Sequence, residues 1–426
     1  MERSDSMNGT RTLIAGEGGS VLVAAATTTG VVALACEGLG LRTHTPSGIP
    51  VYPVDALPGA DDIDEVVVVS CERATLELIV AWADAGGKPL SARSVDVLPA
   101  PEGVRVVAVS GLSTGSGKTA TTRRVARALR ASGVSVAVAR HPIANLLLWG
   151  RFAPSVVRSP EELALSRPLE EREELAPITG TGIPVATGLD GDGVLRAAAR
   201  EAGAGGVVVW DGGGAAAPWV VADLHLVVID VLRPPLEDVD GRIAGADAIV
   251  LAKADSGDPA SMRETEERVR AWNSHAPVVL ADLSVGVGPT GILNDSAVVC
   301  VEDWSSLAIG GLKAGAGTVA ARRFRCGMVD PRPFAVGSVH DALVAHGHIG
   351  PVIPSLGRTE QEIDDLAASV YATPGDVVLW ASNADPAAII PGEQRPIVRA
   401  FGELAEVSGP SLQEVLAPLL PGHRVP

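Results

Sequence analysis

A glycine-rich segment, GLSTGSGKT at residues 111–119, constrains the fold of this chain more than any other feature. It follows the apolar run 104–109 and precedes a helical pattern at 120–129, in which apolar side chains recur at helical spacing. A turn of this kind between a buried strand and a helix presents backbone N–H groups and the positive end of the helix dipole to an anion. The segment therefore predicts a phosphate-binding loop (P-loop) with a nucleoside triphosphate as its ligand.

The motif gives each residue type of this loop a role. Lys118 is expected to reach the β- and γ-phosphates, and the Thr119 hydroxyl is expected to ligate Mg²⁺. The chain has only four lysines against thirty arginines, so the lysine at this position indicates a function. Leu112 stands where the usual spacing has glycine, and Gly111 comes one residue earlier. The residues expected to bind the nucleotide are Thr114, Gly115, Ser116, Gly117, Lys118, Thr119 and Ala120.

Length and composition limit the architecture and the class of partner. A chain of 426 residues is too long for one ordinary core, so two or three domains are expected. Aromatic residues make up only 3%, so the cores must consist of Val, Leu, Ile and Ala, which suits buried parallel strands flanked by helices. A net charge of −17 argues against nucleic acid or an anionic membrane as partner.

The four cysteines are widely spaced and form no CxxC pair, which indicates free thiols rather than a zinc site. The first eleven residues are polar, and no apolar run reaches the length of a membrane span. We therefore expect a soluble, cytoplasmic protein, and we expect it to be a homodimer.

Apolar runs alternate with helical segments along most of the chain, which predicts an α/β protein. Residues 1–11 form a frayed tail, and residues 12–101 form an N-terminal Rossmann-like domain. Residues 102–298 form a P-loop NTPase core with a doubly wound, mostly parallel sheet. Residues 299–426 form a C-terminal α/β region that completes the active cleft.

Asp211 ends the apolar run 207–210 and is followed by three glycines. Ligands of parallel sheets bind at the carboxyl ends of the strands, so Asp211 is expected beside the P-loop, where it can hold Mg²⁺ or orient the attacking group. The alternative is an aspartate that caps a turn.

Residues 249–255 resemble the base-reading NKxD strand end of GTPases, with Ala252 in place of the asparagine. Lys253 can still lie along a base, and Asp255 can still accept a hydrogen bond from a guanine edge. Loss of the asparagine amide favours ATP over GTP as the nucleotide. The alternative is a polar strand terminus.

Arg140 and His141 follow the apolar run 134–139, also at a strand end. Arg140 suits stabilisation of charge on the transferred phosphoryl group, and His141 suits a general base. A histidine before proline in a purely structural turn is the alternative reading of His141.

Several further residues are candidate substrate contacts. The run 169–174 is typical of a solvated helix face, and Glu171 is its candidate. Asp190 can bind a metal or a substrate amine, or it can cap the helix that starts near Val194. Residues 310–317 form a second glycine-rich loop, in which Lys313 and Gly315 can bind an anion. Two rigid proline turns present Arg332 and His348.

Eight further segments are distinctive, and they occur in the order RHP, LEEREE, WDGG, PWVVADLHLVVIDVLRPP, AKAD, GGLKAGAG, VDPRPFAVGS and HIGPVIPSLG. Together they resemble the cyclic 2,3-diphosphoglycerate synthetase family, whose many bacterial members are described as predicted GTPases. The resemblance runs from about residue 12 to 419, with the motifs in order. The loop at 111–119 also resembles that of dethiobiotin synthetase.

The resemblance implies an ATP- and Mg²⁺-dependent ligase that phosphorylates a small acid and closes a ring with release of ADP and phosphate. It places Lys118 and Thr119 on the nucleotide and metal, and Asp211 at a second metal position. It makes Arg140, His141, Lys313 and Arg332 candidates for the substrate or the transferred group.

The chain departs from the family pattern after WDGG, after RHP and ahead of the second glycine loop, where Ala215, Ala144 and Ile309 stand. Each change removes polar groups from the expected pocket, so a substrate other than diphosphoglycerate is expected. Two alternatives remain open: a nucleotide-switched GTPase that delivers a partner or metabolite, and a non-catalytic paralogue.

Overall fold

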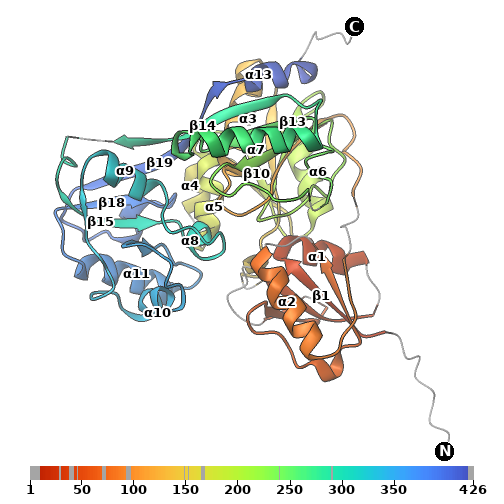
Figure 1. The fold of residues 1–426 in the computed structure, drawn as a ribbon, viewed down its shortest axis with the longest axis horizontal. Helices are drawn as coiled ribbons and strands as arrows, with labels where there is room; N and C mark the ends of the chain where they lie inside the picture. Colours follow the sequence, from red (N-terminus) through yellow and green to blue (C-terminus); the bar gives the residue numbers. More distant parts are fainter. Residues whose placement is uncertain are drawn as a thin grey trace, which may run out of the picture.

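The computed structural model has an α/β architecture in which a large sheet carries two lobes and a separate small domain contains the N-terminal part of the chain (Figure 1). It describes residues 10–27, 30–37, 43–45, 47–69, 73–92, 97–147, 149–151, 153–164, 168–238, 240–288 and 291–420. The expected tail therefore lies mostly outside the described residues.

The N-terminal domain is a sheet of six strands in the order β3-β4-β2-β1-β5-β6, with parallel pairs except at the β3–β4 edge. The glycine-rich residues 16–19 complete β1 and begin α1. Its elements are β1 (Thr12–Glu17), α1 (Gly18–Thr27), β2 (Val31–Glu37), β3 (Thr43–His44), β4 (Pro50–Pro53), η1 (Ala60–Asp62), β5 (Glu65–Val69), α2 (Arg73–Ala85) and β6 (Leu90–Ala92).

The P-loop core is a parallel sheet in the order β14-β13-β12-β7-β11-β8-β10, edged by the antiparallel strand β9. The central strand β7 runs directly into the P-loop, between β11 and β12. The elements are β7 (Arg105–Gly111), α3 (Lys118–Ala131), β8 (Val136–Arg140), η2 (Ala144–Leu146), β9 (Ser155–Val157), α4 (Pro160–Ala164), α5 (Leu169–Thr179), β10 (Val185–Thr187), α6 (Gly191–Ala202), β11 (Val207–Asp211), β12 (Leu224–Asp230), β13 (Ala248–Ala252), η3 (Ala254–Ser256), α7 (Pro259–Trp272) and β14 (Val278–Gly288).

The C-terminal lobe continues the same sheet through β19, β18, β15 and β16, with β17 paired to β15. Its elements are β15 (Ala297–Glu302), α8 (Trp304–Ala308), α9 (Ala316–Arg323), β16 (Gly327–Met328), α10 (Gly337–Ala345), β17 (Ile353–Pro354), α11 (Glu360–Ala372), β18 (Val377–Ala381), α12 (Pro386–Ile389), β19 (Ile397–Ser408), α13 (Leu412–Val415) and η4 (Ala417–Leu419).

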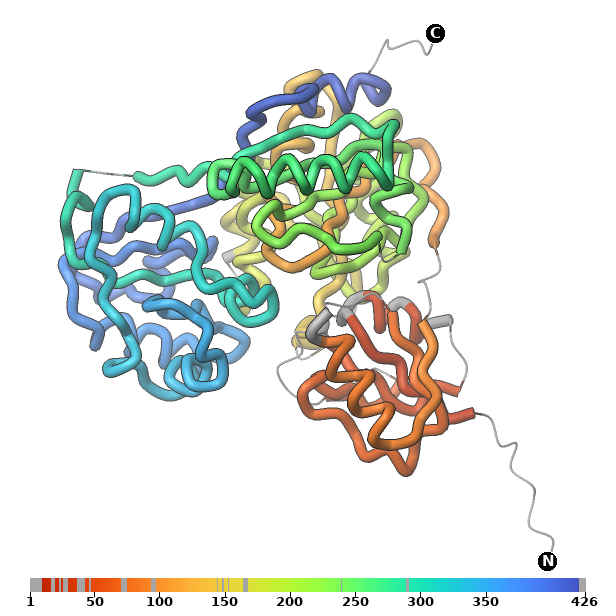
Figure 2. The backbone as a smooth tube through the Cα atoms, in the orientation of Figure 1, coloured from red at the N-terminus to blue at the C-terminus, as the bar shows by residue number. Residues whose placement is uncertain are grey.

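The long antiparallel pair of β14 and β19 joins the two lobes. The chain end then returns to the P-loop core, as the blue trace in Figure 2 shows. There Leu412, Val415 and Leu416 pack in one apolar cluster with Val125 and Leu129 of α3. Residues 299–420 therefore do not form one separate unit, because residues 412–420 complete the core of the other lobe.

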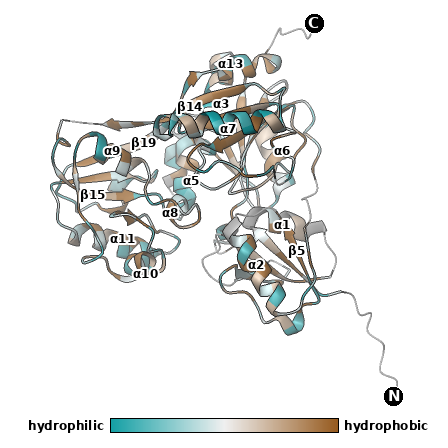
Figure 3. Ribbon diagram, viewed as in Figure 1, coloured by the Kyte–Doolittle hydropathy of each residue, from teal (hydrophilic) through white to brown (hydrophobic). Residues whose placement is uncertain are grey.

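The strands of the core are buried on both faces, which explains their unbroken apolar sequence. Val227 and Ile229 of β12 pack in one cluster, and Leu226 and Val228 pack in another on the opposite face. Figure 3 shows the corresponding pattern, with hydrophobic strands inside and hydrophilic residues along the outer helix α7. No helix in the described part of the chain combines the length and apolar character needed to cross a bilayer.

Candidate active site

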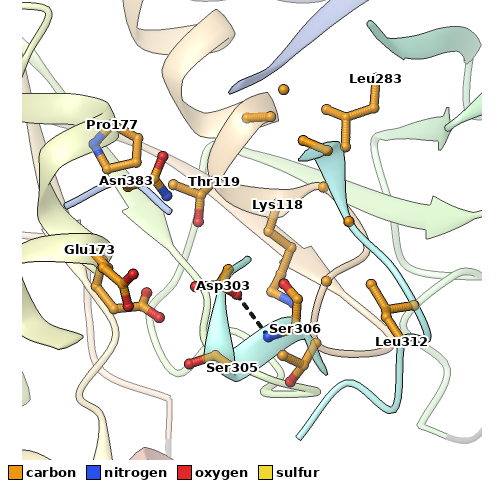
Figure 4. A pocket seen from close by; sticks show the side chains of 18 of the residues that line it. Lys118, Thr119, Glu173, Pro177, Leu283, Asp303, Ser305, Ser306, Leu312 and Asn383 are labelled. Atoms are coloured by element: carbon orange, nitrogen blue, oxygen red, sulfur yellow. Dashed lines mark hydrogen bonds between the residues drawn. The ribbon is translucent and has the colours of Figure 1, made fainter. Parts of the chain in front are cut away.

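A cavity of about 390 Å³ lies at the carboxyl ends of the core strands, between the P-loop, α5 and the C-terminal lobe. Figure 4 shows Lys118 and Thr119 extending from the start of α3 toward Asp303, Ser305 and Ser306, with Glu173 to one side. The cavity therefore brings the nucleotide-binding motif together with carboxylates and hydroxyls from two other parts of the chain.

The P-loop has the backbone that a phosphate requires. Gly115 and Gly117 have φ of 74° and 105°, a region that glycine adopts without strain, and α3 begins directly at Lys118. Lys118 is 7% exposed, and its Nζ donates to the Ser113 carbonyl at 2.7 Å. Of the seven P-loop residues expected to bind nucleotide, all but Ser116 line the cavity.

The structure explains the displaced glycine of the loop. A Cβ on Gly111 would lie 2.6 Å from the Ser116 hydroxyl and 2.9 Å from Cγ of Lys118, so a side chain there would displace both. Leu112 instead packs against the apolar cluster beneath α7. Glycine is required at 111 because the lysine stem passes over it.

Arg140, Asp211 and Glu174 form a buried network beside the P-loop. Arg140 donates from Nη1 to Asp211 Oδ2 at 2.6 Å and from Nη2 to Glu174, while Thr122 donates to the other Asp211 oxygen at 2.7 Å. Asp211 is fully buried and does not line the cavity, whereas Arg140 and Glu174 do. The network positions Arg140 at the cavity wall, and both oxygens of the predicted metal ligand Asp211 accept hydrogen bonds from protein groups.

His141 lies in the core rather than in the cavity, so its prediction as a general base is wrong. The ring is fully buried, its Nδ1 accepts a hydrogen bond from the Trp219 indole at 2.7 Å, and it packs edge-on against Trp210. Proline at 142 turns the chain away after this contact, which matches the structural reading of the His-Pro turn.

The charge run on α5 is buried, so the expectation of a solvated helix face is also wrong. Glu170, Glu173 and Glu174 line the cavity, and we call these three residues the acidic wall. Asn145 donates to Glu170 at 2.8 Å, and Ser382 donates to Glu173. The reason is that α5 is sandwiched between the two lobes.

Burial in this wall raises carboxyl pKa values. Desolvation, followed by the charge of Glu174, raises the pKa of Glu170 to about 8. Desolvation and the charge of Asp303 raise the pKa of Glu173 well above its ordinary value. The pKa of Glu174 is also raised by burial, although Arg140 opposes the shift. A cation in the cavity would relieve this penalty.

The second glycine loop, residues 310–317, closes the cavity from the C-terminal lobe. A Cβ on Gly315 would collide with a carboxylate oxygen of Glu302, and Glu302 accepts two hydrogen bonds from Thr318 at 2.7 Å. Gly315 and Glu302 both line the cavity. Lys313 is exposed and does not line it.

Arg233 connects this loop to the P-loop. Its Nη1 donates to the Gly310 carbonyl at 2.6 Å, and its Nη2 donates to the Thr114 carbonyl at 2.7 Å. Asp230 accepts from Arg233 Nε at 3.0 Å and from Lys253 Nζ at 2.7 Å. Arg233 belongs to the segment PWVVADLHLVVIDVLRPP. The family resemblance assigned no role to this arginine.

Of the candidates Lys253, Asp255, Asp190 and Glu171, only Lys253 lines the cavity. Lys253 has a left-handed backbone with φ of 66°, and Asp255 is exposed in η3. Asp190 caps α6 by accepting from the Gly193 N–H at 3.0 Å, which is the capping alternative. Glu171 is buried near Arg151 rather than at the cavity.

The two proline turns also point elsewhere. Arg332 donates to Asp330 at 3.0 Å and to the Ile349 carbonyl at 2.5 Å, which fixes the turn itself. His348 bonds through Nε2 to the Leu307 carbonyl at 2.9 Å and so supports the end of α8. Both residues stabilise the C-terminal lobe without lining the cavity.

Comparison with known proteins identifies the family. No protein-family model matches the chain. A search of curated proteins finds arginine synthetase ArcE of Thermococcus kodakarensis, which is 31% identical over 389 residues, covering 87% of this chain and 84% of the relative. The chain belongs to the arginine synthetase ArcE family. This assignment supports a synthetase, whereas the narrower likeness to cyclic 2,3-diphosphoglycerate synthetase stays a prediction.

Solved structures give weaker similarities. LpxK from Aquifex aeolicus, crystallised with ATP, covers 82% of this chain and 95% of its own at 14% identity and a TM-score of 0.42. A DUF1611 protein from Anabaena variabilis covers 63% of this chain and 95% of its own at 13% identity and a TM-score of 0.25. Both scores are too low to assign a function.

Proposed function

We propose that this chain is an ATP- and Mg²⁺-dependent ligase that phosphorylates an oxygen of a small acceptor and lets a nitrogen nucleophile displace phosphate. The observation that carries the proposal is that the P-loop and the acidic wall line the same cavity. The P-loop would bind the phosphoryl donor, and the acidic wall would bind a cationic group in the same cavity.

The residues present fit a magnesium nucleotide. Backbone N–H groups of residues 115–120 and the positive end of α3 provide an anion site, and Lys118 and Thr119 provide the cation and the hydroxyl that such sites use. Bound ATP would supply the phosphoryl group. Lys118 would balance its negative charge, and Arg140, held by Asp211 and Glu174, would do so from the carboxyl end of β8.

The acidic wall favours a substrate or product with a guanidinium or ammonium group. The raised pKa values of these three carboxyl groups favour their neutral forms, and a cation beside them would let them ionise and pair with it. A polyanion such as diphosphoglycerate would gain no such pairing. The relative is named for arginine, whose side chain ends in a guanidinium group. A guanidine forms when nitrogen replaces the oxygen of a ureido group. Phosphorylation of that oxygen assists the replacement, because it turns the oxygen into part of a good leaving group, phosphate.

Ring closure is the special case in which the nucleophile belongs to the phosphorylated molecule. The cavity volume of about 390 Å³ suits a compact acceptor in either case. The mass of the product decides between the two, because a cyclic product is lighter than its acceptor by one water and an intermolecular product incorporates the nucleophile.

The nucleotide-switched GTPase is the second candidate, favoured by the position of Lys253 at the cavity. A GTPase of this kind would hydrolyse nucleotide without a small acceptor. In the structure Lys253 is paired with Asp230, and Asp255 is exposed away from the cavity lining, so we retain ATP as the nucleotide.

The proposal is tested by measuring phosphate release from Mg-ATP and Mg-GTP with panels of small carboxylic and ureido acids, each with and without ammonium or a primary amine. The expected result is release that requires both an acid and a nitrogen donor, with ATP preferred. Release that no acceptor stimulates, with GTP preferred, would support the GTPase instead.

A further inference from the structure

A second cavity, of about 650 Å³, adjoins the candidate active site. Arg123, Pro177, Asn383 and Phe401 line both cavities. Figure 4 shows Pro177 and Asn383 next to each other at one edge of the first cavity, beside Thr119. A small molecule at this shared edge would therefore lie close to the reacting groups.

The second cavity has a basic lining in an otherwise acidic protein. Guanidinium groups from three elements converge on it: Arg123 and Arg127 of α3, Arg172 of α5 and Arg399 of β19. Among the described residues that line it, only Asp385 and Glu403 carry carboxylates. The lining thus has a surplus of positive charge, whereas the whole chain has a net charge of −17.

The two carboxylates do not neutralise all four arginines. Asp385 accepts from the Ala387 N–H at the start of α12 and serves as its cap. Glu403 is 3.4 Å from Arg127 and 3.9 Å from Arg123, so it serves this pair of α3 residues. Arg172 and Arg399 have no carboxylate partner among the described residues.

Arg172 provides the sharpest evidence for a ligand. Its Nε is buried and has no hydrogen-bond partner among the described residues, and a buried donor left unpaired is destabilising. Arg399 makes only long contacts, of 3.3–3.5 Å, to the carbonyls of residues 382–384. Both side chains line the second cavity, so an oxyanion bound there would supply the acceptors that they lack.

We propose that the second cavity is an oxyanion site, which binds a carboxylate or phosphate group at the shared edge of the active cavity. Guanidinium groups present parallel N–H donors that match the oxygens of either anion. The anion is either the acid group of the acceptor or the phosphate that leaves the first cavity. The choice between these two sources rests on the proposed function. The existence of the anion site does not depend on it.

The test uses the full chain with Lys118→Ala, which weakens anion binding at the P-loop. Isothermal titration with inorganic phosphate and, separately, with acetate measures each dissociation constant. Arg172→Gln and Arg399→Gln are then added, since neither change removes an ion pair of the described residues. Arg124→Gln is the matched control, because Arg124 is on α3 and pairs with Glu406 outside the cavity.

The expected result is binding of phosphate, acetate or both, weakened about tenfold or more by Arg172→Gln and unchanged by Arg124→Gln. Phosphate binding alone would identify a route for the leaving group, and acetate binding alone would identify a site for the acid group of the acceptor. The proposal is overturned if neither anion binds, or if the Arg172→Gln Arg399→Gln double variant binds as tightly as its Lys118→Ala parent. Since no turnover is measured, its failure is distinct from failure of the ligase proposal.

Discussion

Arg140 and Asp211 are register partners at the carboxyl ends of β8 and β11, and their side chains form a buried ion pair with 2.6 Å between Nη1 and Oδ2. Glu174 of α5 binds the other terminal nitrogen. This pairing ties α5 to the core sheet and holds the acidic wall in the cavity that the P-loop also lines. It explains how an ordinary-looking charge run becomes part of a cavity.

Removing the arginine should therefore destabilise the core. Arg140→Met leaves Asp211 and Glu174 without their buried cation, and we expect a loss of about 3–5 kcal/mol in the free energy of unfolding. Urea denaturation followed by circular dichroism measures the loss. Arg124→Met, which breaks the more exposed pair with Glu406, should cost about 1 kcal/mol or less. Equal effects of the two changes would contradict the assigned role of Arg140.

The P-loop lysine should be required for turnover. Lys118→Ala removes the cation that balances the transferred phosphoryl group, so the rate of ADP release should fall about a hundredfold or more with an unchanged unfolding transition. Lys313→Ala is the control, because Lys313 is exposed in the second glycine loop and outside the cavity lining. A comparable loss in that variant would mean that Lys313 reaches the substrate.

Stability should depend on pH through Glu170. Its pKa of about 8 in the folded chain exceeds the ordinary carboxyl value, so the unfolded chain releases this proton at a lower pH than the folded chain. The contribution of Glu170 to stability therefore decreases as pH rises from about 5 to 8. The unfolding free energy of Glu170→Gln relative to the parent should increase over this range. A difference independent of pH would show that Glu170 titrates normally.

Arg233 should couple the two loops that face each other across the cavity. Arg233→Ala removes the donors to the carbonyls of Thr114 and Gly310, and we expect faster amide hydrogen exchange in both residues 113–117 and 306–312. Arg268→Ala is a matched control, because Arg268 bonds to the Pro235 carbonyl and to Glu264 without joining the loops. Faster exchange in only one loop would contradict the coupling.

The sequence was sufficient to predict the α/β class, the core strands and the P-loop, because these depend on local patterns. The apolar run 248–252, for example, has the same bounds as strand β13, because both faces of that strand are buried. The strand β19 was missed because its alternating exposed residues follow from pairing with β14, a partner more than a hundred residues away.

The site was less predictable because burial of a charge depends on distant elements. His141 was expected at the site and the charge run on α5 was expected in solvent. In the structure the histidine packs against two tryptophans in the core, and the acidic wall lines the cavity. No local pattern separates Glu173 from Glu171 on one helix. The packing of the two lobes gives Arg233 its two carbonyl partners and leaves Arg172 Nε without one among the described residues. Neither outcome can be read from local sequence.

The most direct test of the ligase proposal follows one oxygen atom. The acceptor that stimulates phosphate release is labelled with ¹⁸O at its carboxyl or ureido oxygen, and the released phosphate is analysed by mass spectrometry. The proposal predicts one ¹⁸O in the phosphate, because the acceptor oxygen is phosphorylated before nitrogen displaces it. Phosphate whose new oxygen comes only from water would contradict the proposal and indicate simple nucleotide hydrolysis.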